Sequence, residues 1–99
     1  MSGHFGLVAE DLTLLLNILK PFQIQGKVFG SRVRGTEKKF SDLDLCILGQ
    51  VSFNLIGQLQ EAFEASSLPI VVDVSRYEDL NPDFQELVDR EGVLVPFRS

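Results

Sequence analysis

Residues 29–48 read FGSRVRGTEKKFSDLDLCIL, and this stretch decides the fold. A short β-type run over residues 27–29 leads into it and stops at Gly30. The stretch closes on residues 43–48, where Leu, Leu and Ile alternate with Asp, Cys and Leu at the two-residue period of a strand. Residues 32–41 between the two runs hold one helical turn followed by a polar loop. We therefore expect two strands joined by a charged connection.

Hydrophobic spacing outside this stretch predicts three longer helices and two further strands. The first helix covers residues 7–20, has an apolar face that includes Val8, and is stopped by Pro21. The second begins after Ser52, a good helix cap, and carries its own apolar stripe.

The last third of the chain predicts a strand, a helix and an edge strand. Residues 70–74, IVVDV, are nearly all apolar, which is typical of a strand buried on both faces. The triplet Asn81-Pro82-Asp83 starts a helix whose buried face includes Phe84 and which Gly92 ends. A short edge strand follows over residues 93–95.

The order α-β-turn-β-α-β-α-β predicts an α/β (α+β) fold, a small mixed sheet backed by helices. The 99 residues, 44% hydrophobic and 23% charged, suit one domain over residues 1–99. The formal charge of −5 argues against a protein that coats nucleic acid, and no apolar run reaches the length of a membrane span. The single Cys46 excludes an internal disulfide, and we expect it to be a small buried residue. With no visible signal peptide, the expected location is cytoplasmic.

Positive charge is concentrated around the quoted stretch. Residues 27–39 hold five of the nine cations and a single acidic residue, Glu37; the cations are Lys27, Arg32, Arg34, Lys38 and Lys39. A basic segment on an acidic protein favours a small anionic ligand over a long polyanion.

Three carboxylates are candidates for a metal site. Asp42 and Asp44 flank Leu43, so in a strand they point to one face, where they repel unless a cation lies between them. Oxygen ligands with open positions suit Mg²⁺ or Mn²⁺. Asp73 lies in an apolar strand, where a carboxylate is costly unless it is paired or bound to metal. If the two strands are neighbours, the three acids predict a two-metal site of the kind used in phosphoryl and nucleotidyl transfer.

Gly30 and Ser31, between a strand and a helical turn, are candidates for phosphate binding. Glycine lets the backbone approach a ligand, and free N–H groups at a helix start attract phosphate oxygens. Each feature also has a simpler explanation: solvated acids, an ordinary turn, or a salt bridge between Asp73 and Arg76. Their conjunction in this order favours a catalytic site.

The pattern Gly30-Ser31, ten residues, then Asp42-Leu43-Asp44 resembles the G-S-x10-D-x-D signature of nucleotidyltransferases with the DNA-polymerase-β-like fold. Residues 29–48 and the closing segment LNPDFQELVDREGVLV look like the minimal nucleotidyltransferase (MNT) branch of that superfamily.

The resemblance implies a role for each candidate residue. Asp42 and Asp44 would bind two Mg²⁺ ions, with Mn²⁺ as an alternative, and Asp73 would complete the metal site and orient or deprotonate the acceptor. The β- and γ-phosphates would be held by Gly30 and Ser31. Arg34 would contact the triphosphate, and Arg32 has a weaker case because we expect its neighbour Val33 to point inward.

The implied reaction is attack of a hydroxyl on the α-phosphorus of a nucleoside triphosphate, ATP foremost, with release of pyrophosphate. MNT proteins are commonly paired with a helical HEPN-domain protein, so the resemblance implies an antitoxin that transfers AMP to a tyrosine of a HEPN toxin. Two alternatives stay open: a non-catalytic module that neutralises a HEPN partner by complex formation, and a nucleotide-binding remnant with an unrelated partner. We expect no membrane or direct nucleic-acid partner, while a homodimer or a hetero-oligomer would cover an open face.

Overall fold

The computed structural model describes residues 4–35 and 42–95, and for His4, Ser31 and Arg34 it describes the backbone alone. The helices are α1 (Ala9–Leu19), α2 (Ser31–Arg34), α3 (Phe53–Glu64) and α4 (Pro82–Glu91). The strands are β1 (Gly26–Phe29), β2 (Leu43–Ile47), β3 (Val72–Arg76) and β4 (Val93–Leu94). Short 3₁₀ turns occupy His4–Gly6, Lys20–Phe22 and Tyr77–Asp79. The expected order of helices and strands is confirmed.

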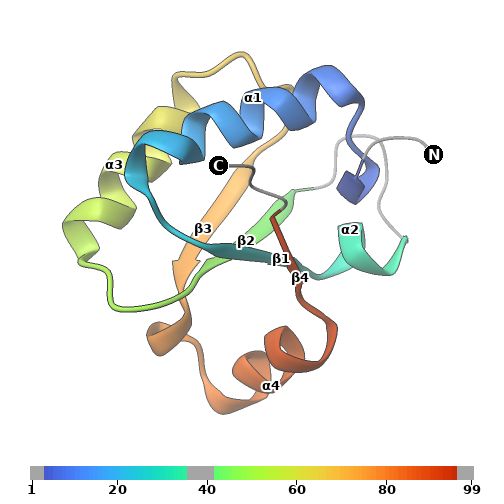
Figure 1. The fold of residues 1–99 in the computed structure, drawn as a ribbon. Coiled ribbons are helices and arrows are strands. Elements are labelled where there is room, and N and C mark those ends of the chain that lie inside the picture. Colours follow the sequence, from blue (N-terminus) through green and yellow to red (C-terminus); the bar gives the residue numbers. More distant parts are fainter. Residues whose placement is uncertain (1–3, 36–41, 96–99) are drawn as a thin grey trace.

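The strands form one mixed sheet in the order β3-β2-β1-β4. β2 and β3 run parallel, whereas β1 is antiparallel to both β2 and β4. The helices α1 and α3 cover one face of this sheet and α4 covers the other (Figure 1). The predicted α/β fold with a small mixed sheet backed by helices is confirmed. No helix in the described part of the chain is long and apolar enough to cross a membrane.

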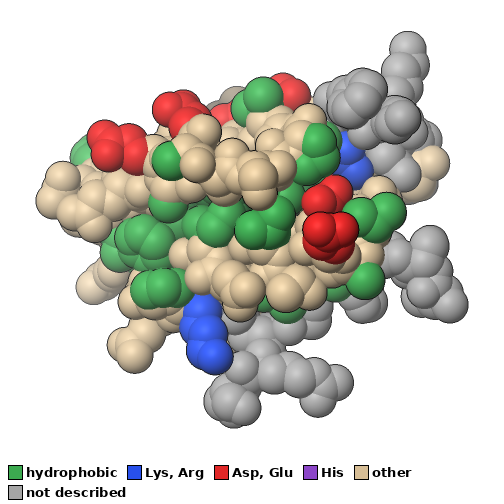
Figure 2. All heavy atoms as spheres, turned by 90° about the horizontal axis from the view of Figure 1, so that it is seen from above, with side chains coloured by type: hydrophobic (Ala, Val, Ile, Leu, Met, Phe, Trp, Pro, Cys, Tyr) green, Lys and Arg blue, Asp and Glu red, His purple; other side chains and the backbone are tan. Residues whose placement is uncertain are grey.

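The main core lies between the sheet and the helices α1 and α3. From β2 come Leu43, Leu45 and Ile47, all completely buried, as the two-residue alternation predicts. They pack with Leu15 of α1 and Leu59 of α3. Burying each of these side chains contributes about 1.5–3 kcal/mol, so this face fixes β2 in the centre of the sheet. Seen from above the view of Figure 1, apolar side chains form a band with acidic side chains along one edge and towards one end, and basic side chains at the opposite edge (Figure 2).

A smaller core lies on the opposite face, under α4. Phe29, Cys46 and Val88 are its buried members. Burial raises the pKa of the Cys46 thiol to about 11, so the thiol stays neutral and packs as a small apolar group. The expected role of Cys46 is confirmed.

Helix caps place α3 and α4 as the sequence predicts. The Ser52 side chain accepts a hydrogen bond from the Leu55 N–H at 3.0 Å, and the Asn81 side chain accepts one from the Phe84 N–H at 3.0 Å. Each cap satisfies one of the free N–H groups in the first turn of its helix.

Three sequence expectations are wrong in their details. The third strand covers residues 72–76 rather than 70–74, and it buries only one face, because α3 packs against that face alone. Val8 is exposed, since the helix begins at Ala9, two residues after the expected start, and leaves Val8 as its cap. Phe84 is 48% exposed instead of buried, whereas Val88 of the same expected face does lie in the core.

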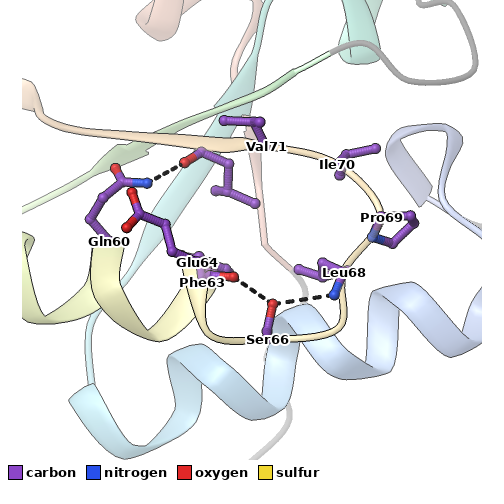
Figure 3. A pocket seen from close by; sticks show the side chains of 9 residues that line it. Gln60, Phe63, Glu64, Ser66, Leu68, Pro69, Ile70 and Val71 are labelled. Carbon is purple, nitrogen blue, oxygen red and sulfur yellow. Dashed lines mark hydrogen bonds between the residues drawn. The ribbon is translucent and has the colours of Figure 1, made fainter.

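The outer edge of β3 is held by a side chain of α3. The Gln60 Nε2 donates to the Val72 carbonyl at 2.8 Å (Figure 3). The Val74 N–H donates to Gln60 Oε1 at 3.3 Å. The Val71 carbonyl instead accepts from Leu43 of β2, so the groups that Gln60 binds point away from the sheet. One amide therefore satisfies a donor and an acceptor that have no neighbouring strand.

We expect Gln60→Ala to lower the free energy of unfolding by about 1–2 kcal/mol, because it leaves two partly buried backbone groups without their partner. Urea denaturation measures the change. Gln58→Ala is the matched control, since Gln58 is exposed on the same helix and the substitution changes helix propensity equally. Equal stability of the two variants would contradict the role given to Gln60.

Candidate active site

Strand register brings two of the predicted acids together. In the parallel pairing of β2 and β3, Asp44 lies directly opposite Asp73. Residues paired in this way project from the same face of the sheet, on strands about 4.8 Å apart. Asp42 is exposed and precedes the first residue of β2, so it lies just outside the strand pairing.

The electrostatics of Asp44 reflect this crowding of acids. Burial raises the pKa of the Asp44 carboxyl, and the negative charges of Asp73 and Asp42 raise the pKa further. Both of the other predicted acids therefore lie close enough to act on Asp44.

Gly30 lies against the Asp44 carboxylate at the end of β1. Its φ is +86°, a conformation that favours glycine, and a Cβ built there would lie 2.6 Å from Asp44 Oδ2. The Gly30 carbonyl accepts a hydrogen bond from the Val33 N–H at 3.1 Å and so begins the single turn of α2. A backbone corner without a side chain thus adjoins the acids. The side chains of Ser31 and Arg34 lie outside the described residues.

A pocket of about 410 Å³ opens beside the two paired acids. One side carries Asp44, Asp73 and Ser75, and the other is apolar. The apolar side consists of Phe29, Leu80 and Phe84. Of the residues that line this pocket, the Gly-Ser and D-x-D motifs contain Asp44 alone. Phe84 in particular is predicted from its helical spacing to be buried, and only the position of α4 shows that it faces this pocket.

The acidic residues of the site could supply some, but not all, of the ligands of a divalent cation. Within residues 4–35 and 42–95, no three His, Cys, Asp or Glu side chains are gathered closely enough to hold one ion together. The expectation that Asp42, Asp44 and Asp73 share a two-metal site stays a prediction. Mg²⁺ commonly takes one or two carboxylates together with water and substrate phosphates. The facing pair Asp44 and Asp73 suits that coordination.

The predicted cations are distributed differently from the expectation. Arg32 is 5% exposed and its Nη1 donates to the Phe5 carbonyl at 2.9 Å, while Val33 is only half-buried. Val33 packs against the main core as expected, but Arg32 is unexpectedly buried as well, because the N-terminal turn supplies a carbonyl acceptor for its guanidinium. Lys38 and Lys39 lie outside the described residues.

Arg76, the alternative partner of Asp73, is engaged elsewhere. Its guanidinium donates to both carboxylate oxygens of Asp79, at 2.7 and 2.8 Å, and lies 3.7 Å from the centre of the Phe53 ring. This bidentate pair orders the turn after β3 and leaves Asp73 facing the pocket.

A second hollow, of about 560 Å³, lies between the end of α3 and the segment that leads into β3 (Figure 3). Glu64 is the single carboxylate in its lining, and much of the remaining wall is apolar. Ser66 is already bonded within the loop, to the Phe63 carbonyl at 2.6 Å and the Leu68 N–H at 3.3 Å. This hollow lacks the paired acids and the glycine corner, so the smaller pocket is the candidate active site.

Comparison with known proteins adds a family and several relatives. Residues 22–99 match the family described as polymerase beta, nucleotidyltransferase. The protein named "Probable protein adenylyltransferase MntA" from Haemophilus influenzae is 35% identical over 97 residues, which cover 94% of this chain and 85% of that protein.

Solved structures share the fold. A toxin–antitoxin structure with AMP-PNP superimposes with a TM-score of 0.67 at 20% identity, covering 88% of this chain and 73% of that one. A structure assigned provisionally as a minimal nucleotidyltransferase has a TM-score of 0.66 at 28% identity, covering 89% of this chain and 90% of its own.

We expect Asp44→Asn to raise the thermal stability of the metal-free protein at about pH 7.5. The pKa of Asp44 is raised in the folded state, so ionising this carboxyl costs stability that is lost as the pH rises from acid towards neutral. The asparagine has no such cost, and its advantage should shrink towards about pH 4, where the native carboxyl is increasingly protonated.

Melting temperatures across this pH range, measured with EDTA present, test the expectation. Glu61→Gln is the control, because Glu61 is an exposed carboxylate on α3. A lower melting temperature for Asp44→Asn than for the wild type at neutral pH would contradict the repulsion described above.

Proposed function

This chain belongs to the polymerase beta nucleotidyltransferase family, and from that premise we propose that it transfers AMP from ATP to a hydroxyl group of a partner toxin. The observation that carries the proposal is the in-register pair Asp44 and Asp73 beside the side-chain-free corner at Gly30. The name of the Haemophilus relative, a protein adenylyltransferase, supports AMP as the transferred group. The toxin–antitoxin structures of the same fold support a toxin as the acceptor.

The nucleotide is held at the corner between β1 and α2. Backbone N–H groups after Gly30 approach the β- and γ-phosphates, since no side chain intervenes there. Ser31 and Arg34 supply a hydroxyl and a guanidinium to the same phosphates.

Asp42, Asp44 and Asp73 would hold Mg²⁺, for which Mn²⁺ could substitute. When bound, the metal neutralises charge on the attacking and leaving oxygens and lowers the repulsion between the acids. The facing pair Asp44 and Asp73 would supply two of the protein ligands and Asp42 the third, while nucleotide phosphates and water would be the remaining ligands.

The transfer replaces a phosphoanhydride bond of ATP with a phosphoester bond to the acceptor. The acceptor hydroxyl oxygen forms a bond to the α-phosphorus while the bond from that phosphorus to the bridging oxygen of the β-phosphate breaks. Pyrophosphate leaves with the electron pair of that bond. The Asp73 carboxylate takes up the hydroxyl proton, because it flanks Asp44 on the side away from the Gly30 corner.

The partner proposed is a HEPN-type toxin, and its modified hydroxyl is that of a tyrosine. The formal charge of −5 disfavours a polyanionic acceptor such as nucleic acid. ATP as the donor agrees with the cytoplasmic location expected from the sequence.

Incubation of the purified chain with the toxin, Mg²⁺ and ATP tests this function. Label from α-³²P-ATP should appear on the toxin, whereas label from γ-³²P-ATP should not, because pyrophosphate is released. We expect Asp44→Asn and Asp73→Asn each to lower the transfer rate by about 100-fold or more, and chelation of the metal to abolish transfer. Glu61→Gln should retain the wild-type rate.

Absence of α-label with the wild-type chain would overturn the proposal. If the toxin is nevertheless inhibited equally by the wild type and by Asp44→Asn, neutralisation results from complex formation, as in the alternative raised by the sequence.

A further inference from the structure

The apolar side of the active-site pocket has no role in the chemistry just described. We propose that Phe84 and Leu80 hold the aromatic ring of the acceptor side chain and so make the enzyme selective for tyrosine over serine and threonine. This inference rests on the proposed function and deepens it, because it assigns the acceptor subsite to particular residues.

The order of the strands determines which substrate faces this wall. Gly30 follows β1, Asp44 lies on β2 and Asp73 lies on β3, so the phosphate corner and Asp73 are on opposite sides of Asp44. In-line displacement places the attacking oxygen opposite the leaving pyrophosphate. The acceptor hydroxyl therefore enters from the β3 side.

The pocket extends on that side. Its lining continues from Asp73 to Ser75 of β3 and then to Leu80 and Phe84, at the beginning of α4. A side chain whose hydroxyl meets Asp73 there has its remaining atoms against Leu80 and Phe84. A tyrosine brings a flat apolar ring to that wall, which serine and threonine lack.

The wall is available and already ordered. The Phe84 side chain is 48% exposed, so covering it removes apolar surface from water. Its backbone is fixed by the Asn81 cap, and Gln85 Nε2 donates to the Tyr77 carbonyl at 2.9 Å. The Leu80 N–H donates to the same carbonyl at 3.1 Å. Because this segment is already ordered, binding of the ring costs little further conformational entropy.

The negative charge of the pocket also favours an acceptor side chain that is itself uncharged. Asp44 and Asp73 form the polar side, and they disfavour an acceptor that carries its own negative charge. A neutral aromatic ring with a terminal hydroxyl matches both sides: the ring lies on Phe84 and the hydroxyl lies at the acids.

Steady-state AMP transfer with the toxin as acceptor tests this subsite. We expect Phe84→Ala to raise KM for the toxin about 10-fold while KM for ATP stays unchanged, and Phe84→Tyr to restore most of the affinity. Phe53→Ala is the control, because Phe53 is also an exposed phenylalanine but stacks on Arg76 at the other end of β3. Mass spectrometry of the modified toxin should locate AMP on tyrosine.

The outcomes separate the two proposals. If the wild-type chain transfers AMP and Phe84→Ala leaves KM for the toxin unchanged, the acceptor subsite is wrong and the proposed function stands. A raised KM for ATP instead would place the nucleotide base on Phe84 and would also overturn the subsite. AMP found on serine or threonine would overturn the selectivity. No transfer by the wild-type chain would refute the proposed function itself.

Discussion

The repulsion between Asp44 and Asp73 is the constraint on which the rest of the structure depends. Parallel pairing of β2 and β3 sets these carboxylates side by side, and burial makes it harder for Asp44 to ionise. The protein maintains this arrangement because the opposite face of the same strands is a tightly packed apolar core, in which Leu45 and Val74 are held by α1 and α3. Packing on one face of the sheet thus stabilises charge crowding on the other.

Gly30 makes the crowded acids accessible. Any side chain at this position would meet the Asp44 carboxylate, and its positive φ is unfavourable for other residues. The strand end therefore leaves backbone rather than side chain next to the acids, which suits a ligand that brings both phosphate oxygens and a cation. Both the close approach to Asp44 and the positive φ therefore require glycine at position 30.

Sequence patterns predict the parts of the fold that local interactions decide. The alternation in β2 follows from burial of one face, and the caps at Ser52 and Asn81 act within a single helical turn. The spacing of Asp42 and Asp44 likewise needs only the geometry of one strand. These features were predictable because each depends on residues a few positions apart.

Features that depend on distant segments were not predictable. Burial of Arg32 requires the carbonyl of Phe5, 27 positions earlier, to lie beside α2. Exposure of Phe84 depends on how α4 crosses the sheet, and helical spacing does not specify that angle. The pairing of Asp44 with Asp73 needs β3 to lie next to β2, which the sequence allows without specifying.

The Gln60 amide also bears on how this protein meets other copies of itself. A strand at the margin of a sheet normally offers its outward N–H and C=O groups as a template for another extended chain, which is a route to aggregation. At β3, the Val72 carbonyl and the Val74 N–H are already taken by a side chain from the same molecule. Gln60 thus occupies two backbone groups that an added strand would need, and so disfavours pairing of β3 with a strand from another molecule.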